Sequence, residues 1–398
     1  MRIVYHHRTR GRDVEGVHIR GIVGALRHLG HEVTIVSFPG ADPEQAEAAA
    51  PRVRAKSALS TLVSKTPGVL FELLELGYNL VTWFRIGRVV RRARPDLIYE
   101  RYSLFLFATI LKARRHGIPI VLEINDSALV PRVRPLFLKA LARRIERWCM
   151  QNCTGLVFIS SYFRDLAREA YGTISPSVVS PNAADAARFD PALFDREALR
   201  RRHGIGREVV CGYVGAFVHW HGVAEFVRRM APRLAQRHDL KLVFVGGGVD
   251  LDAVRATVEE HGVADRVLLP GRVDHADIPG WIACMDLAVL PNSNVYGSPM
   301  KLFEFMAMGV GVVAPDYSPI AEVVEDGRTG WLFPRGDIEA CVDRVLTVAG
   351  SPAEQVAVGR AAREYIVRER QWRTNAEQLL SLLPRDAIAS APARSPAA

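Results

Sequence analysis

The sequence alternates, along both of its halves, short aliphatic runs with longer amphipathic stretches, and this alternation constrains the fold more than any other feature. Short apolar strands joined by helices are typical of a parallel sheet covered by helices. Helical patterns such as Val17–Leu29 follow most of the runs. The strands expected in the first half are Arg2–Tyr5, Glu32–Ser37, Leu97–Glu100, Ile118–Glu123, Gly155–Ile159 and Ser177–Val179.

The pattern breaks at Pro181–Asp185 and then resumes. Two doubly wound domains in 398 residues agree with the usual domain size of roughly 100–200 residues. We therefore predict an α/β protein with domains at 1–185 and 186–370, a closing helix at 371–384, and a disordered tail at 385–398 that is rich in Pro, Ala and Ser. The strands expected in the second domain are Val209–Val214, Lys241–Val245, Arg266–Leu269, Leu287–Leu290, Gly311–Ala314 and Gly330–Leu332.

The composition indicates the cellular compartment and the charge of the partners. The five cysteines are an odd number and are scattered, which indicates neither a disulfide framework nor a zinc cage. The segment MRIVYHH lacks the features of a signal peptide, and the apolar stretch Val69–Phe84 is too short to span a bilayer and contains two glutamates. These observations predict a cytoplasmic protein. The net charge of +9 favours anionic partners.

Ligands of open α/β sheets bind beyond the carboxyl ends of the strands, where backbone N–H groups and helix N-termini are free. Two such sheets facing one another form a cleft, and we expect the chemistry in that cleft. The loops expected to line it are His6–Gly16, Gly215–Gly222, Gly246–Asp250, Gly271–Ala276 and Asn292–Met300.

The segment Tyr296–Gly309 is the most informative of these regions. Ser298 suits an N-cap and Pro299 suits the first helical position, so the next backbone N–H groups and the helix dipole can face a phosphate. Lys301 adds a positive charge, and Glu304 can accept hydrogen bonds from a pair of sugar hydroxyls. Local capping by Ser298 and Glu304 is the alternative explanation.

The segments SPMKLFEFMAMGVGVVAPD and IAEVVEDGRTGWLFPRGD resemble the donor-site helix, and the strand and turn after it, of the retaining glycosyltransferases of family 4. The resemblance covers nearly the whole chain. It implies the GT-B fold of two Rossmann-like domains facing a cleft, and a nucleoside-diphosphate sugar of the UDP or GDP type as donor substrate, with no cofactor. It also implies that Glu304 binds the donor ribose. The donor is further expected to contact Tyr296, Gly297, Ser298, Pro299, Met300 and Lys301.

One departure from that family concerns its usual pair of glutamates separated by seven residues. The position of the first glutamate, eight residues before Glu304, holds Tyr296. A sub-branch with the pattern SPxKxFE(Y/F)MA resembles this chain more closely, which implies a working site with altered sugar contacts. An inactive relative is the other interpretation.

The glycine turn Gly212–Gly222 shows a second departure. In the family this loop supplies an arginine and a lysine to the diphosphate, and these positions follow Gly215 and precede Gly222. Here they hold Ala216 and His221. His221 can donate to a phosphate oxygen and, when protonated, stabilise the leaving group. Packing at a domain edge is the alternative.

Three further turns of the second domain carry weaker signals. Gly246 begins a glycine run after a strand, and Arg272 and Val273 resemble the turn whose backbone contacts the nucleobase. The segment Asp250–Asp252 matches a metal-binding spacing of another glycosyltransferase fold. Helix capping explains it better, so we predict no catalytic metal.

The acceptor is expected in the first domain. Gly16 and His18 belong to a loop that resembles the acceptor loop of the family, and its arginines and histidines suit an anionic acceptor or the donor phosphates. Glu100, Arg101 and Asn125 follow two strands and can orient an acceptor hydroxyl. Solvated arginines and simple loop anchors are the alternatives.

The stretch 51–94 surrounds an apolar centre with basic residues. Such a composition suits either peripheral contact with the inner face of a membrane or a helix pair packed on the sheet with a solvated basic face. No nucleic-acid-reading motif accompanies the charge, so we predict no nucleic-acid partner.

These observations together predict a retaining, metal-independent glycosyltransferase. Lys301, Glu304 and His221 would carry the catalysis, and the acceptor would be a sugar, a lipid-linked sugar or a small metabolite. Envelope polysaccharide or glycoconjugate synthesis is the expected process. A sugar-nucleotide epimerase or phosphorylase on the same fold and a catalytically silent sugar-nucleotide-binding protein remain open alternatives.

Overall fold

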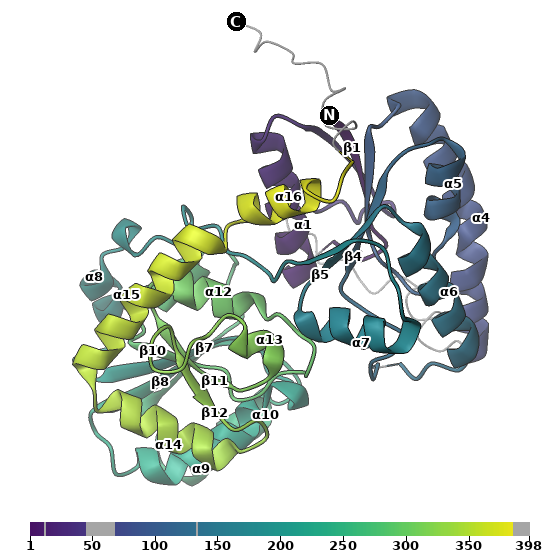
Figure 1. The fold of residues 1–398 in the computed structure, drawn as a ribbon. Coiled ribbons are helices and arrows are strands. Elements are labelled where there is room, and N and C mark those ends of the chain that lie inside the picture. The colour runs from purple at the N-terminus through teal and green to yellow at the C-terminus, as the bar shows by residue number, and fades with distance from the viewer. Residues whose placement is uncertain (12, 45–67, 133, 385–398) are drawn as a thin grey trace, which may run out of the picture. The chain divides into compact units, whose positions relative to one another are not determined.

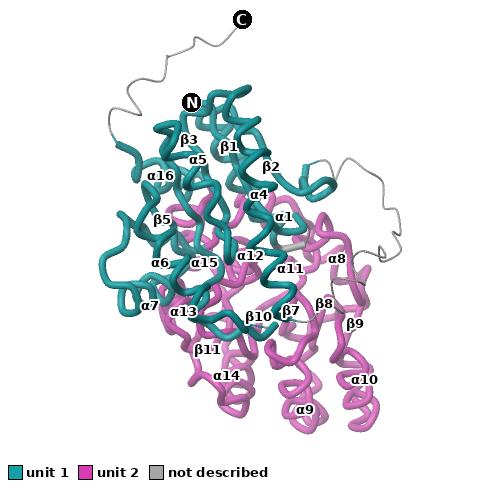
Figure 2. The backbone as a smooth tube through the Cα atoms, turned by 90° about the vertical axis from the view of Figure 1, so that its right-hand side faces the viewer, with its two compact units in different colours: residues 1–181, 373–398 teal, residues 182–372 magenta. Residues whose placement is uncertain are grey.

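The computed structural model of the chain describes residues 1–11, 13–44, 68–132 and 134–384. The predicted tail, and the first part of the 51–94 stretch, lie outside these ranges. The chain forms two compact units, residues 1–181 with 373–398 and residues 182–372, which Figure 2 shows in different colours. Among the described residues, no helix combines the length and the apolar character needed to cross a membrane.

Unit 1 contains a six-stranded parallel sheet with strand order β2-β1-β3-β4-β5-β6. All residues of the central strand β4 are buried, which explains why four of its five residues are apolar. The helices that cover the sheet lie between successive strands (Figure 1). The elements are β1 (Arg2–His6), α1 (Asp13–His28), β2 (Glu32–Val36), α4 (Gly68–Ala93), β3 (Leu97–Arg101), α5 (Ala108–Arg115), β4 (Ile120–Ile124), α6 (Lys139–Asn152), β5 (Gly155–Phe158), α7 (Ser161–Tyr171) and β6 (Ser177–Val179).

Unit 2 contains a second six-stranded parallel sheet with strand order β12-β11-β10-β7-β8-β9. Its strands are β7 (Val209–Ala216), β8 (Leu240–Gly247), β9 (Val267–Gly271), β10 (Leu287–Val289), β11 (Gly311–Pro315) and β12 (Trp331–Phe333). Its α-helices are α8 (Arg196–Arg202), α9 (Val223–Leu234), α10 (Leu251–Glu260), α11 (Ile278–Ala283), α12 (Met300–Ala307), α13 (Ser318–Ala321), α14 (Ile338–Ala349) and α15 (Pro352–Glu369). Three 3₁₀ turns are η1 (Pro191–Leu193), η2 (His219–His221) and η3 (Ala264–Arg266).

Successive residues of the unit 2 strands enter two different hydrophobic cores. On β7, Val210 and Val214 pack in the core that includes α11, α12 and α15, whereas Cys211 and Tyr213 pack in the core that includes α9 and α14. This alternation follows from the two-residue period of a strand. The sheet is therefore buried on both faces, as the sequence predicts.

The chain returns to unit 1 at its C-terminal end. Helix α16 (Trp372–Leu380) follows α15, and the side-chain amide of Asn375 donates to the carbonyl oxygen of Pro181 at 2.8 Å. Leu382 packs so closely on Gly155 of β5 that a Cβ there would lie 2.9 Å from the Cβ of Leu382. These contacts explain why residues 373–384 group with the first unit.

The α/β prediction of two doubly wound parallel sheets is confirmed, and each predicted strand is present within a few residues. The start of α12 is a correction. The helix begins at Met300 with Pro299 at the N-cap, whereas the sequence predicts Ser298 as the cap. The backbone N–H of Asn182 donates to the Ser298 hydroxyl at 3.0 Å, and its side-chain amide donates to the Ser298 carbonyl at 2.5 Å. Ser298 is thus tied to the first residue of unit 2 rather than to the helix.

Candidate functional site

Strand order directs attention to one place in each unit. In unit 1 the order reverses between β1 and β3, and in unit 2 it reverses between β7 and β10. Open α/β sheets bind ligands at the carboxyl ends of the two strands beside such a reversal. Gly215 and Ala216 end β7, and Tyr296–Pro299 lie between β10 and α12, which begins at Met300, so the predicted donor residues gather at this point of unit 2.

The ammonium group of Lys301 lies at the centre of the unit 2 cluster. It donates to the hydroxyl of Tyr213 at 2.9 Å and lies 4.3 Å from the centre of the Tyr213 ring. Burial lowers the pKa of Lys301 to about 7, and the charge of Glu304 offsets this only in part. A cation that is buried without a carboxylate in contact is costly, and an anionic ligand would remove that cost.

Two glycines make room for this ammonium group. A Cβ on Gly215, whose φ is +148°, would lie 2.4 Å from the Nζ of Lys301. A Cβ on the paired Gly246 would lie 1.9 Å from the carbonyl oxygen of Gly215. Only glycine fits such close approaches, so the predicted glycine turn packs directly against the predicted lysine.

His221 joins the same group through its Nδ1 atom. That atom lies 2.7 Å from the carbonyl oxygen of Ala216 and 3.0 Å from the Tyr213 hydroxyl. Burial and the nearby Lys301 charge lower the pKa of His221 to about 4. Four residues from β7, η2 and α12 therefore share one hydrogen-bonded network.

Glu304 lies on α12, one turn after Lys301, and is 7% exposed. Its Oε1 atom is 3.4 Å from the Nε2 of His275, and the buried Nδ1 of His275 has no hydrogen-bond partner among the residues that the structure describes. Arg272 and Val273 lie between β9 and His275; Arg272 is close to Gly247, and Val273 packs on the hydrophobic core. The structure thus brings the β9–α11 loop beside Glu304.

The predicted capping of α10 by an aspartate agrees with the structure only in where the helix starts. Asp250 occupies the N-cap position, but its side chain makes no capping hydrogen bond and instead pairs with the Nδ1 of His219 at 2.8 Å. The expected capping interaction is therefore wrong, although the predicted helix start is right. In the part of the chain that the structure describes, no three His, Cys, Asp or Glu side chains form a group that could hold a metal ion.

In unit 1, three predicted acceptor residues converge on Glu123 of β4. His18 of α1 lies 2.7 Å from its carboxylate, Arg101 of β3 donates at 2.9 Å, and Asn125 donates at 2.5 Å. Burial alone would raise the pKa of Glu123, but the charges of His18 and Arg101 hold it well below its usual range. The cluster therefore neutralises itself.

The other two predicted acceptor residues lie apart from this cluster. Glu100 pairs with His6 at 2.5 Å through one carboxylate oxygen, and its other oxygen is buried with no hydrogen-bond partner in the described part of the chain. Gly16 faces the β1–α1 loop, where a Cβ would lie 2.6 Å from the carbonyl oxygen of Gly11. The Nε2 of His7 is also buried, and none of the described residues forms a hydrogen bond with it.

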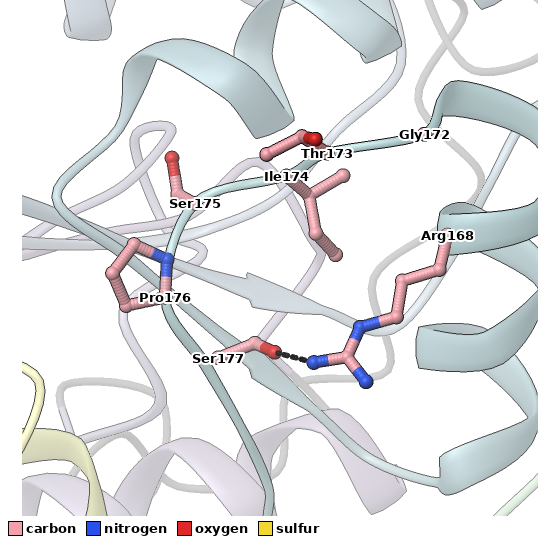
Figure 3. A pocket seen from close by; sticks show the side chains of 7 residues that line it. All are labelled: Arg168, Gly172, Thr173, Ile174, Ser175, Pro176 and Ser177. Atoms are coloured by element: carbon pink, nitrogen blue, oxygen red, sulfur yellow. Dashed lines mark hydrogen bonds between the residues drawn. The ribbon is translucent and has the colours of Figure 1, made fainter.

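A cavity of about 410 Å³ lies elsewhere in unit 1 (Figure 3). Arg168 points toward Ser177 across it and donates to the Ser177 hydroxyl at 3.4 Å. Its lining residues are Arg168, Gly172, Thr173, Ile174, Ser175, Pro176 and Ser177. They precede or begin β6, so this cavity belongs to the amino edge of the parallel sheet and contains none of the predicted site residues.

Sequence reasoning missed Tyr213 and Glu123 as members of the two clusters. Each is a polar group within an apolar strand. Glu123 is one residue from the carboxyl end of β4, and Tyr213 is three residues from the carboxyl end of β7. Polar groups in buried strands need partners, so an isolated Tyr or Glu in such a run is a usable signal.

Comparison with known proteins agrees with this architecture. The family described as "Glycosyltransferase Family 4" matches residues 16–188, and the family described as "Glycosyl transferases group 1" matches residues 208–351. A glycosyltransferase structure from Rickettsia africae has a TM-score of 0.75 at 14% identity, covering 96% of this chain and 99% of that one. The HepE structure from Anabaena in complex with UDP has a TM-score of 0.70 at 17% identity, covering 96% of this chain and 99% of that one.

Two relatives show the range of substrates in this group. A GDP-mannose-dependent phosphatidylinositol monomannoside mannosyltransferase from Mycolicibacterium smegmatis is 29% identical over 250 residues, which cover 61% of this chain and 65% of that protein, just under two thirds. The 2-deoxystreptamine glucosyltransferase of Streptomyces kanamyceticus is 25% identical over 364 residues, covering 87% of this chain and 92% of that protein. With both domain families matched along its length and the GT-B fold in place, the chain belongs to the family 4 glycosyltransferases.

Proposed function

We propose that the protein transfers a sugar from a nucleoside diphosphate to an acceptor hydroxyl with retention of configuration, in polysaccharide or glycoconjugate synthesis. The observation that carries this proposal is the partly buried Lys301 ammonium at the strand-order reversal of unit 2, which no carboxylate of the described residues contacts. A diphosphate supplies the missing negative charge. As the glycosidic bond breaks, charge grows on the leaving diphosphate and strengthens this interaction.

In this proposal Glu304 binds the ribose of the donor. Its carboxylate is buried and its contact with His275 is long, so its oxygens can still accept hydrogen bonds from a hydroxyl pair. Both UDP and GDP donors occur among the relatives and structural neighbours, so the base remains part of the test. Unit 1 supplies the acceptor site, and the residues around Glu123 form the floor of that site.

The experiment is a panel of UDP- and GDP-sugars with and without candidate acceptors. Transfer predicts that an acceptor accelerates release of the nucleoside diphosphate. Interconversion of the sugar would instead indicate an epimerase, and binding without turnover would indicate a silent binding protein. Glu304→Ala is expected to lower kcat/KM at least about tenfold through lost ribose hydrogen bonds. The surface variant Glu260→Ala serves as the control, and unchanged kinetics in Glu304→Ala would refute the assignment.

We further propose that α4 contacts an anionic lipid surface. Its exposed face carries large apolar side chains, of which Leu74, Leu80 and Phe84 are 58%, 65% and 63% exposed. The same face continues into exposed arginines Arg88, Arg91 and Arg92, and the two glutamates of α4 are buried or half-buried. Apolar side chains beside cations and without exposed acids match the interface of an anionic bilayer.

Vesicle co-sedimentation tests this contact. The protein should bind phosphatidylglycerol vesicles, and Phe84→Asp should weaken that binding severalfold. Leu193→Asp is a matched control, because Leu193 of unit 2 is equally exposed at 65%. Equal binding of all three proteins would contradict the proposal.

A further inference from the structure

The atoms that surround the Nδ1 of His221 indicate which of its two ring nitrogens carries the proton. The nearest is the carbonyl oxygen of Ala216 at 2.7 Å, and a carbonyl oxygen carries only lone pairs. A contact this short requires a proton between the two atoms, and that proton must sit on the ring nitrogen. The geometry therefore favours the ring form with hydrogen on Nδ1.

The Tyr213 hydroxyl is consistent with the same assignment. It lies 2.9 Å from the Ala216 carbonyl, to which it can donate, and it accepts from Lys301 at 2.9 Å. If Tyr213 instead donated to the Nδ1 of His221, two lone pairs would face each other across 2.7 Å. That arrangement is repulsive, so the proton of Tyr213 belongs on the Ala216 side.

With hydrogen on Nδ1, the Nε2 of a neutral imidazole presents a lone pair. Burial and the Lys301 ammonium lower the pKa of His221 to about 4, so the ring is neutral near pH 7. A phosphate oxygen also presents lone pairs and repels such an atom. A hydroxyl group can donate to it.

We propose that His221 accepts a hydrogen bond from a hydroxyl of the donor's sugar, while the neighbouring Lys301 ammonium binds the diphosphate. This assignment rests on the proposed function and gives His221 a different role from the leaving-group stabilisation that its loop position suggests. It makes His221 a residue that distinguishes a nucleotide sugar from the bare nucleotide, because only the former carries the sugar hydroxyl.

Calorimetric titration with UDP, UDP-glucose, GDP and GDP-mannose separates these roles. His221→Ala should weaken binding of the preferred nucleotide sugar about 3- to 10-fold, the usual effect of one neutral hydrogen bond, and leave the corresponding diphosphate unchanged. His219→Ala is a matched control on the same 3₁₀ turn, where the imidazole pairs with Asp250. That control should change neither affinity.

Two results would overturn the proposal: an equal loss for diphosphate and nucleotide sugar, which indicates a phosphate or ribose contact, or no loss for either. Nitrogen-15 NMR of the ligand-free protein at pH 7.5 gives an independent readout, since it distinguishes the two neutral imidazole forms. A proton on Nε2 would also overturn it. Failure of the wild-type protein to bind any of the four nucleotides would instead refute the proposed function, whatever the NMR result.

Discussion

The polar clusters of the two units differ in how their charge is balanced. In unit 1 the carboxylate of Glu123 is surrounded by His18, Arg101 and Asn125, and its pKa is held well below the usual range. In unit 2 the ammonium of Lys301 is partly buried with a neutral hydroxyl as its hydrogen-bond partner, and its pKa falls to about 7.

This difference indicates what each cluster does before a ligand arrives. A buried ion that already has its counter-ions contributes mainly to the integrity of the sheet edge, whereas a buried ion without one is held ready for a charged ligand. We therefore expect substitutions at Glu123 to change stability first and substitutions at Lys301 to change ligand affinity first.

The largest expected effect is the loss of stability in Glu123→Gln. Removing the charge leaves Arg101 and His18 buried without their counter-ion, which costs about 3–5 kcal/mol of unfolding free energy. Urea denaturation followed by far-UV circular dichroism measures this cost. Glu32→Gln, at an exposed position of β2, is the control. A loss below about 1 kcal/mol would show that the unit 1 cluster contributes little to the stability of the sheet edge.

Lys301→Met should show the opposite pattern. Loss of a charge-assisted hydrogen bond is worth about 1.5–3 kcal/mol, so affinity for the preferred nucleoside diphosphate should fall about 10- to 100-fold. The folded-state pKa of Lys301 lies below its unfolded value, so charging this group opposes folding fully below pH 7 and less and less toward pH 10. The variant should therefore unfold at higher urea than the wild type at pH 6.

Calorimetry and urea denaturation at pH 6 check both halves of this prediction. Lys139→Met removes an exposed lysine at the start of α6 and should change neither quantity. A destabilised Lys301→Met protein that still binds nucleotide normally would reverse the comparison between the two clusters.

The strands could be predicted because their signal is local. Runs such as Ile120–Ile124 are buried on both faces, and four apolar residues out of five show this directly in the sequence. The start of α12 could not be predicted in the same way. Ser298 has the composition of an N-cap, but its hydroxyl accepts from Asn182, which lies 116 residues earlier in the chain.

The sequence predicts where the candidate site lies on the sheet, but it does not predict the hydrogen bonds within that site. Strand ends and glycine turns placed Gly215 and Lys301 at the same edge of the sheet, because parallel strands end at one edge. The hydrogen bonds that set the state of each group come from other elements. Tyr213 of β7 holds Lys301 of α12, and no spacing rule connects two residues 88 positions apart.

The smallest expected effect is a pH dependence of donor binding, which the titration of Lys301 in unit 2 causes. A diphosphate beside Lys301 raises the pKa of the lysine above its ligand-free value of about 7, so binding above pH 7 takes up a proton. Affinity for UDP or GDP should then fall by up to about tenfold, or 1.4 kcal/mol, between pH 7.5 and 8.5. The terminal phosphate has a pKa near 6 and is already ionised in that interval, so it contributes little. Lys301→Arg keeps its charge throughout and should show a flat profile, because the guanidinium stays protonated. An equally steep profile in Lys301→Arg would assign the titration to another group and remove the central contrast between the two units.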